Sequence, residues 1–256
     1  MYFETRKLAL MCVFAALYAV FSLVSLFPII GALGRFITLA TVLAPIVGML
    51  LGPYVGVAAA SVGGFVGWAV TQSGAFGFVS FIPGSLSALT AGFLINGERR
   101  VSAVFYLILF LAMAFFPLIG PVWLFPLFMW FQLIGLVVLV SPVSAVASKS
   151  LRADRIDRLT LGVGVIALVS ALAGQVAGTL MFEVFFYPFN PQIESWRTAQ
   201  WQFLTFVYPV ERIIIAVLAT LVGVPLIRAI RSYGFEVGGT QSAITRNSNR
   251  ANTAEK

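Results

Sequence analysis

Long uninterrupted apolar runs are the feature of this sequence that most constrains its fold. Residues 159–182, for example, contain no charged side chain. A helix of about 20 mostly apolar residues crosses the hydrocarbon core of a membrane. Only 10% of the chain is charged, against roughly 25% in a soluble domain. Too few charges remain to cover a water-facing surface, so the sequence predicts a polytopic membrane protein.

The same runs predict helices. Within lipid, only α-helices and closed β-barrels satisfy their own backbone hydrogen bonds, and barrel strands alternate polar and apolar residues, which these continuous runs do not. The first run follows Arg6 and Lys7, but it is longer than the apolar core of a signal peptide, so we interpret it as a helix. We predict an all-α fold with eight membrane spans, roughly 8–30, 36–51, 54–72, 79–96, 101–118, 122–147, 159–186 and 204–231.

Two regions follow from this pattern. Residues 1–236 are predicted to form a single transmembrane helical domain. Residues 237–256 are polar and rich in Asn, Ser and Thr, a composition too poor in apolar side chains to build a core. We therefore predict that this segment is a disordered cytoplasmic tail.

The basic residues predict how the spans are oriented. One set of loops and ends carries most of them: Arg6, Lys7, Arg99, Arg100, Lys149, Arg152, Arg155, Arg158, Arg228, Arg231, Arg246, Arg250 and Lys256. The opposite set carries Arg35, Arg197 and Arg212. Because cytoplasmic loops are enriched in Lys and Arg, we predict a multi-pass cell-membrane protein with both termini in the cytoplasm. This bias accounts for the net charge of +7 without a nucleic-acid partner.

Several chemistries lack their usual residues in this sequence. Cys12 is the single cysteine and there is no histidine, so the common zinc and iron ligand sets are missing. No GxxxxGK[ST] phosphate-binding loop occurs, and a His-based catalytic triad has no histidine to use. We therefore expect neither a metal nor a cofactor, and we do not expect an enzyme.

Small residues recur at a spacing of four along several spans. Gly52, Gly56, Ala60 and Gly64 form one such row, and spacing of this kind lets helix backbones approach closely in lipid. Gly52 and Pro53 also predict a tight turn between two antiparallel spans. The first span has a similar row of small residues that includes Ala15 and Ala19. This row either packs inside the bundle or contacts another membrane subunit.

The loop before the last span predicts a short helix across the outer mouth. Asn190 followed by Pro191 is typical of a helix start, so we expect a helix over residues 191–202. Trp196 and Trp201 are either interface anchors or rings that stack on a flat ligand. Arg197 and Gln200 are candidate polar contacts in the same segment.

An adjacent Glu211 and Arg212 open the last span. Neighbouring helical residues point about 100° apart, so we expect one to face the bundle and the other its rim. The two form either a structural ion pair or handles for a polar ligand. We interpret Glu211 as the cavity-facing residue and Arg212 as rim or ion-pair support. Glu183 is the other acidic residue predicted near the outer face within a span.

Four segments together resemble a known family. They are KLALMCVFAALYAVFSLV, LLGPYVGVAAASVGGFVG, PGSLSALTAGFLINGERR and YPVERIIIAVLATLVGVPLIRAI. In this order they are similar to the first, second-to-third, fourth and last helices of the substrate-binding S components of energy-coupling factor (ECF) vitamin transporters. The resemblance covers roughly residues 7–100 and 204–231.

The resemblance implies a membrane-embedded subunit that captures a vitamin or metal from outside. It also implies a transmembrane coupling protein and cytoplasmic ATPases as partners, with Ala15 and Ala19 facing the coupling protein. The ligand would lie under the loop Phe27 to Ile37, which contains Arg35. Family members typically have six helices, so residues 101–147 are an added hairpin, or one or two runs are re-entrant. Metal-binding members use N-terminal histidines, which are missing here, so an organic ligand is expected.

These considerations give one set of candidate residues and two leading functions. The aromatic mouth favours a ring-bearing ligand, and the candidate ligand contacts are Arg35, Trp68, Gln72, Glu183, Trp196, Arg197, Tyr208, Glu211 and Arg212. The first function is substrate capture for an ECF-type importer. The alternative is an autonomous secondary transporter or lipid-handling membrane protein that uses Glu183 and Glu211. A membrane enzyme acting on a lipid has the least support.

Overall fold

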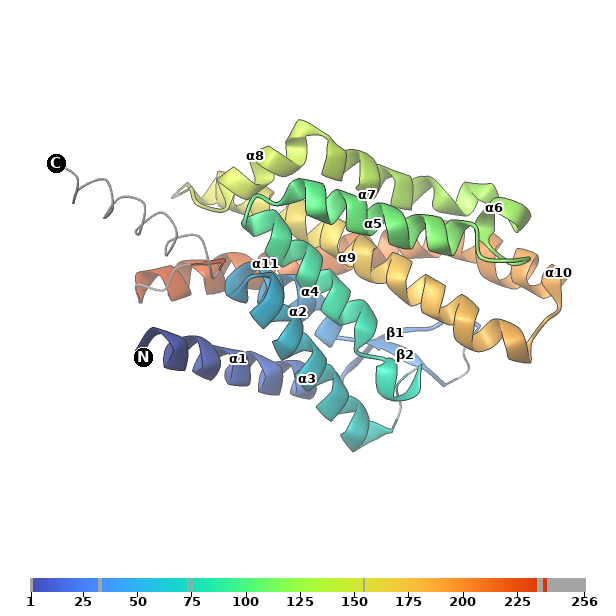
Figure 1. The fold of residues 1–256 in the computed structure, drawn as a ribbon, viewed down its shortest axis with the longest axis horizontal. Coiled ribbons are helices and arrows are strands. Elements are labelled where there is room, and N and C mark those ends of the chain that lie inside the picture. Colours follow the sequence, from blue (N-terminus) through green and yellow to red (C-terminus); the bar gives the residue numbers. More distant parts are fainter. Residues whose placement is uncertain are drawn as a thin grey trace, which may run out of the picture.

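The computed structural model describes residues 2–31, 34–72, 74, 76–153, 155–233 and 237–238, and over these residues the fold is all-α apart from one short β-hairpin. Figure 1 shows the helices aligned mostly along the long axis. The elements are α1 (Tyr2–Phe21), β1 (Ser25–Pro28), β2 (Phe36–Thr38), α2 (Ala40–Leu51), α3 (Pro53–Thr71), η1 (Gly77–Val79), α4 (Ile82–Ile95), α5 (Arg99–Ala114), α6 (Pro121–Leu124), η2 (Pro126–Met129), α7 (Trp130–Val140), α8 (Pro142–Ser150), α9 (Ile156–Phe186), η3 (Tyr187–Phe189), α10 (Ile193–Ser195), η4 (Trp196–Gln202) and α11 (Phe203–Ser232).

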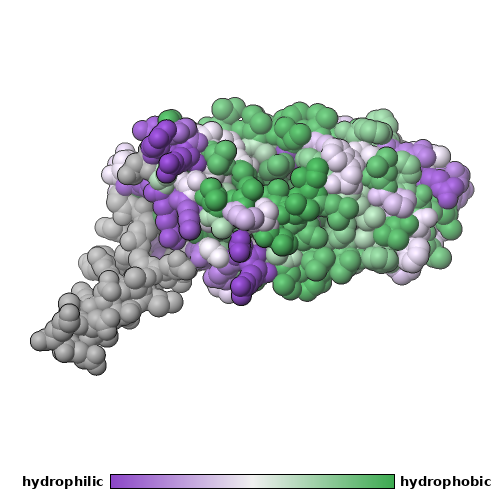
Figure 2. Space-filling view, turned by 90° about the horizontal axis from the view of Figure 1, so that it is seen from above, coloured by the Kyte–Doolittle hydropathy of each residue, from purple (hydrophilic) through white to green (hydrophobic). Residues whose placement is uncertain are grey.

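Several of these helices identify a membrane protein. Among the described residues, four helices are long and apolar enough to cross a membrane: Pro53–Thr71, Gly77–Ile95, Ile156–Phe189 and Ile193–Ser232. The bent pair Pro126–Val140 and Pro142–Ser150 gives a fifth candidate span if the two helices are counted together. Figure 2 shows an apolar belt between hydrophilic groups at the two ends. Each of the eight predicted spans contains a helix, but the crossing of the membrane by all eight stays a prediction.

The two ends of the molecule differ in what they carry. The start of α1 and the end of α11 lie at one end, called here the terminal end (Figure 1). The hairpin of β1 and β2 lies toward the other end, with α6 and α10, and this is called the hairpin end. Gly238 reaches the bundle at the terminal end, where its N–H donates to the carbonyl of Leu50 at 3.2 Å. The rest of the predicted tail, residues 239–256, lies outside the described residues.

Helix α4 is central and is packed by its small residues. It contacts α2, α3 and α9. A Cβ on Gly48 of α2 would lie 2.0 Å from the carbonyl oxygen of Ala88, so the two backbones touch. Helix α1 packs on α3 in the same way, because a Cβ on Gly63 would lie 2.4 Å from the carbonyl oxygen of Ala15. The predicted role of small residues in helix packing is confirmed for these pairs.

The predicted turn between the second and third spans is also confirmed. Gly52 has φ of 79°, a left-handed region that favours glycine. Pro53 is the first residue of α3, where its missing N–H costs no helical hydrogen bond. The turn brings α2 and α3 into contact as direct neighbours.

Residues 99–150 form an outer layer that packs mainly on α9, with further contacts to α4 and α11. Helices α5, α7 and α8 all contact α9, and the Tyr106 hydroxyl joins α5 to α7 by donating to the carbonyl of Gln132 at 2.9 Å. The predicted span 122–147 is not one straight helix, because the axis bends by 69° at Ser141. Ser141 has an extended backbone and caps α8, which begins at Pro142, a residue that removes a helical hydrogen bond.

The first helix is shorter than predicted. It ends at Phe21, and the apolar residues that follow leave the helix and form strand β1, which pairs antiparallel with β2. The sequence Leu23 to Ile30 is as apolar as a helix interior, but it contains Val, Phe and Ile, which also suit strands. Pro28 has no N–H to continue a helix, and it ends β1 at the tip of the hairpin.

The helix predicted across the mouth is also placed differently. Helix α10 begins at Ile193 and continues through the π-helical segment η4 into α11, giving one helix from Ile193 to Ser232. It therefore enters the bundle directly. Asn190 is not its cap: its backbone carbonyl instead accepts the indole N–H of Trp196 at 2.7 Å.

Candidate ligand-binding site

Two adjoining cavities lie between the helices toward the hairpin end. The charged cavity has a volume of about 100 Å³, and its polar lining residues are Thr41, Ser87, Gln175, Thr179, Tyr208 and Arg212. The neutral cavity has a volume of about 180 Å³ and is lined by Trp68 and several hydroxyl side chains. Both share Ile29 and Ile37 of the hairpin region, together with Phe76. Roughly 10–15 Å³ by this measure holds one water, so each space admits a small organic molecule.

Helix α11 places Tyr208 and Arg212 on one wall of the charged cavity. The two residues are four apart, so they lie one above the other on the same helix face. The Arg212 guanidinium carbon lies 5.5 Å from the centre of the Tyr208 ring, a cation–π arrangement. The ring of Phe128, 6.0 Å away between centroids, supports Tyr208 from behind. The Tyr208 ring thus packs between Phe128 and the Arg212 guanidinium, and it helps to fix the position of that guanidinium.

Glu211 and Arg212 form a buried ion pair, and Arg212 is the one that lines the cavity. Their closest atoms, Nη2 of Arg212 and Oε2 of Glu211, are 3.3 Å apart, and each side chain is 7% exposed. Glu211 is not among the cavity-lining residues. The interpretation of Glu211 as the cavity residue and Arg212 as its rim support is therefore reversed. The backbone directions do diverge, but the long arginine side chain bends back to reach its neighbour.

Helix α9 supplies the polar wall of the same cavity opposite the hairpin. Gln175 and Thr179 are four residues apart and share a face. Gln175 is held by Gln132 of α7: with its amide oriented to satisfy its neighbours, Gln132 donates to the carbonyl of Phe128 at 2.8 Å and accepts from Nε2 of Gln175 at 3.0 Å. This link connects the outer layer of helices to the cavity wall.

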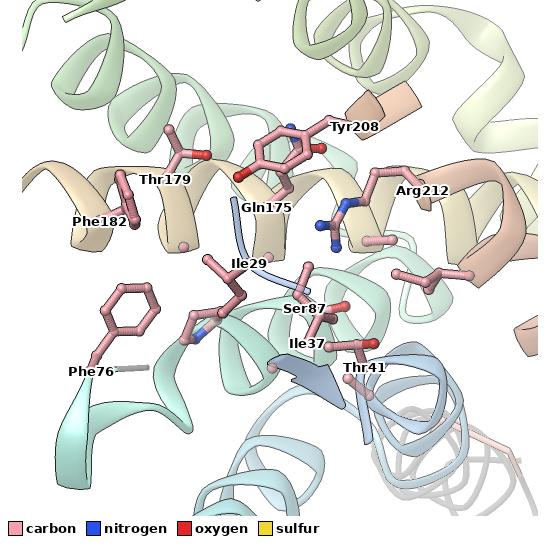
Figure 3. A pocket seen from close by; sticks show the side chains of 17 residues that line it. Ile29, Ile37, Thr41, Phe76, Ser87, Gln175, Thr179, Phe182, Tyr208 and Arg212 are labelled. Carbon is pink, nitrogen blue, oxygen red and sulfur yellow. The ribbon is translucent and has the colours of Figure 1, made fainter. Parts of the chain in front are cut away.

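Two hydroxyls in the charged cavity have no hydrogen-bond partner among the described residues. They are Oγ of Ser87 and Oγ1 of Thr179, and each residue is 4% exposed. Buried polar atoms are nearly always hydrogen-bonded in proteins. Figure 3 shows Ser87 and Thr179 on different walls with Tyr208 and Arg212 nearby. These groups converge on the space that a ligand or water would fill.

Trp68 is the predicted site residue that lines the neutral cavity. Its indole lies against the rings of Phe65 and Phe78, with centroids 5.6 Å and 6.2 Å apart. Tyr208 and Arg212 line the charged cavity, as described above. The structure therefore brings these three of the nine predicted contacts to the two cavities.

The tryptophans of the last loop fill a packing role in this structure. Trp196 is 2% exposed and its ring contacts Phe182 and Trp201. Trp201 is 0% exposed and its indole N–H donates to the carbonyl of Ile119 at 2.7 Å. Neither lines either cavity. Their burial differs from both sequence interpretations, the membrane anchor and the ligand platform.

The remaining predicted contacts lie outside both cavities. Arg197 is exposed and pairs with Glu194 at 3.6 Å, and the exposed Gln72 donates to the carbonyl of Ala69 at 3.1 Å. Arg35 lies in the hairpin loop directly before β2, where its carbonyl accepts the N–H of Ile29 at 2.9 Å. Glu183 is 0% exposed, and neither of its carboxylate oxygens has a hydrogen-bond partner among the described residues.

The predicted partner residues Ala15 and Ala19 face α3. Ala15 is 8% exposed, and its carbonyl oxygen lies against Gly63. Ala19 is half-buried, with its carbonyl oxygen 3.3 Å from the Cβ position of Gly67. This small row is therefore used for packing inside the chain, the first of the two alternatives that the sequence left open.

Sequence reasoning missed much of the charged cavity. Gln175 was detectable in principle, because an amide in the middle of an apolar span needs a polar partner. Ser87 and Thr179 gave no separate signal, since small hydroxyl residues also serve ordinary helix packing. Phe182 and Phe76 are two among 24 phenylalanines. Their positions follow only from the fold.

The fold and cavities define an all-α membrane protein with a partly charged cavity between its helices. Among the described residues, no three His, Cys, Asp or Glu side chains lie close enough together to hold a metal ion. None of the comparisons with protein-family models, curated proteins and solved structures finds a match to this chain. The function is therefore proposed from the site itself and from the resemblance described above.

Proposed function

We propose that this protein is a membrane-embedded substrate-capture subunit that binds a small organic, ring-bearing ligand in the charged cavity. The observation that carries this proposal is the cavity lining, which is mostly apolar with a few convergent polar groups around Arg212. Binding sites for small molecules have this composition. The unpartnered hydroxyls of Ser87 and Thr179 add hydrogen-bonding groups for a ligand.

The arrangement of helices supports an ECF-type S component in particular. The cavities are lined from six helices: α1, α2, α3, α4, α9 and α11. Residues 99–150 line neither cavity and pack around the core, mainly on α9. A six-helix core with an added hairpin is what the family resemblance implies for a chain of this length.

We further propose that all eight predicted spans cross the membrane, with α7 and α8 forming one bent span. The terminal end, where α1 begins and α11 ends, then faces the cytoplasm, because its loops carry most of the arginines and lysines. The hairpin end faces outward and opens the cavities to ligand from outside. A cell-membrane location follows from this orientation.

By the same resemblance, the partners are a transmembrane coupling protein and cytoplasmic ATPases. Ala15 and Ala19 pack against α3, so a coupling protein docking on α1 meets its exposed face instead. Substitution of Ala16, which is exposed, tests that contact without disturbing α3. Loss of ATPase co-purification in Ala16→Trp, with ligand binding retained, supports this assembly.

The ligand-binding proposal is tested by mass spectrometry of small molecules released from the gently purified protein. We expect a ring-bearing compound from the wild type, and its loss in Ser87→Leu, which fills the charged cavity. Ser102→Leu is the matched control, since Ser102 is also buried but lies on α5 away from both cavities. Each substitution overpacks a core at a cost of roughly 1–3 kcal/mol. If Ser87→Leu retains the compound, or if the wild type releases no compound and binds no ring-bearing probe, the proposal is wrong.

Glu183 favours a second candidate, an autonomous proton-coupled carrier. A fully buried carboxyl without a partner is a common proton site in transporters. Purified protein in sealed vesicles would then take up ligand when a proton gradient is imposed, without any ATPase. Glu183→Gln is expected to abolish this uptake, and uptake that persists in the variant rejects the carrier.

A further inference from the structure

Arg212 is the one charged residue among the described residues that line the two cavities. Every other lining side chain is neutral, so the electrostatic preference of the site depends on this guanidinium. A cationic ligand would meet a positive charge in a poorly solvated space, where repulsion is strong. The charge of the site therefore selects against cations.

The guanidinium retains free donors. It bonds to Glu211 through Nη2 alone, at 3.3 Å, and its Nε has no hydrogen-bond partner among the described residues. Arginine carries five N–H donors in a planar fork, and the fork matches the two oxygens of a carboxylate. A single contact to Glu211 leaves room for a second anion.

The surrounding hydroxyls complement the same anion. Figure 3 shows Ser87 and Thr41 below the guanidinium and Tyr208 beside it. The Ser87 hydroxyl is buried and has no partner among the described residues. An O–H group donates readily to an oxyanion, and such charge-assisted bonds are stronger than neutral ones.

Glu211 decides how much negative charge the site accepts. In the empty cavity it offsets the buried charge of Arg212, which would otherwise be costly. A bound monoanion shares the Arg212 guanidinium with Glu211, whereas a phosphate dianion adds a second negative charge that no other described residue lining the cavity offsets. Glu211 is thus a positioning residue that favours a carboxylate over a phosphate.

Aromatic rings dominate the opposite end of the cavity, where Thr179 also lies (Figure 3). Phe76 and Phe182 lie there, away from Arg212 (Figure 3). Phe182 stacks on Phe186 with centroids 4.6 Å apart, and Phe76 lies 5.9 Å from the ring of Phe185. Rings fixed in this way offer faces for the apolar body of a ligand.

We propose that the charged cavity binds a small carboxylic acid with its carboxylate at Arg212 and Ser87 and its ring or aliphatic body between Phe76 and Phe182. This inference rests on the proposed binding function, and it adds the charge and orientation of the ligand. The same geometry disfavours the neutral amide of that acid, which cannot pair with the guanidinium as an anion.

The test uses matched probes on the full-length wild-type protein in detergent. The probes are indole-3-propionate, indole-3-propionamide and 3-phenylpropyl phosphate, with affinity measured by calorimetry and by the shift in Tm. We expect the acid to bind roughly 10- to 150-fold more tightly than the amide, and more tightly than the phosphate. Arg212→Gln removes the preference for the acid, and Arg212→Lys restores part of it.

The outcomes separate this inference from the function on which it rests. Equal binding of acid and amide, or tighter binding of the phosphate, overturns the carboxylate and leaves the binding function in place. If no probe binds, the compound released from the purified protein decides: one that gains a methyl group on esterification supports the inference, and a neutral or cationic one overturns it. No released compound and no bound probe overturns both. The wild-type comparison holds even if Arg212→Gln fails to fold.

Discussion

The charged and neutral cavities share a wall but differ in what they offer a ligand. The neutral cavity is the larger, about 180 Å³ against about 100 Å³, yet it provides only hydroxyls and the indole of Trp68. The smaller one contains Arg212, Gln175 and two unpartnered hydroxyls. Space is therefore supplied mainly by α3, the β-hairpin and the loops beside them, and chemical discrimination by α9 and α11. The charged and amide groups of the site thus lie in the C-terminal half of the chain, and Ser87 adds its hydroxyl from α4.

The largest expected effect comes from breaking the ion pair of the charged cavity. Arg212→Ala leaves Glu211 buried without its partner, and we expect the free energy of unfolding to fall by about 3–5 kcal/mol. Unfolding in a mild detergent titrated with dodecyl sulfate measures this change. In the double variant Arg212→Ala with Glu211→Met no charge remains, so much of the loss should be recovered. A double variant no more stable than Arg212→Ala would show that the pair is not the cause.

Glu183 extends the comparison to a buried carboxyl outside both cavities. Its two oxygens have no partner among the described residues, so Glu183→Met removes unsatisfied groups while nearly keeping the side-chain length. We expect the free energy of unfolding to rise by about 1–3 kcal/mol. Glu211→Met is the matched control and should destabilise the protein, because it strands Arg212. If both variants shift in the same direction, the contrast between the two carboxyls is wrong.

The Tyr208 hydroxyl is expected to have a smaller effect. Tyr208→Phe keeps the ring beside Arg212 and removes one polar group from the charged cavity. We expect the affinity for a bound carboxylate to weaken by roughly 2- to 12-fold, the range for one neutral hydrogen bond. Calorimetry against the wild type measures it, and unchanged affinity would remove Tyr208 from the polar contacts.

Trp68 gives the smallest expected change in affinity. It lines only the neutral cavity, so Trp68→Ala should alter carboxylate affinity by less than about threefold. Phe182→Ala, in the charged cavity, is the comparison variant and should weaken binding more. A large loss in Trp68→Ala would show that one ligand extends through both cavities, and the division drawn between them would no longer hold.

The sequence was informative where polar residues are rare. Arg212 and Tyr208 stood out at the start of an apolar run, and both line the charged cavity. The sequence did not show whether Glu211 or Arg212 faces the cavity. Adjacent helical residues point in two different directions, and a long side chain such as arginine can reach back from either one. Ser87 and Thr179 were invisible, since a hydroxyl at a helix contact and one at a ligand site look alike in sequence.

The same limits apply to the fold. All-α architecture followed from the lipid constraint on backbone hydrogen bonds, and the Gly52–Pro53 turn from two residues with narrow backbone preferences. Hydropathy could not place the end of α1, because residues 23–30 are mostly apolar and a hydropathy profile does not distinguish an apolar strand from an apolar helix. Pro142 indicated a bend at Ser141, but the apolar residues on both sides favoured one continuous span in the sequence.

The helix from Ile193 to Ser232 connects the charged cavity to the terminal end of the protein. Arg212 lies partway along it, and Arg231 at its far end donates to the backbone carbonyl of Leu151 in the turn between α8 and α9. At 1.5 Å per residue the distance between these two arginines along the helix is about 28 Å. A tilt of about 10° pivoting at Arg212 would displace the far end by about 5 Å, estimated from that helical rise. A side-chain event at the ligand is thus linked to the opposite surface of the protein by one continuous helix, which contains Pro225 between the two arginines.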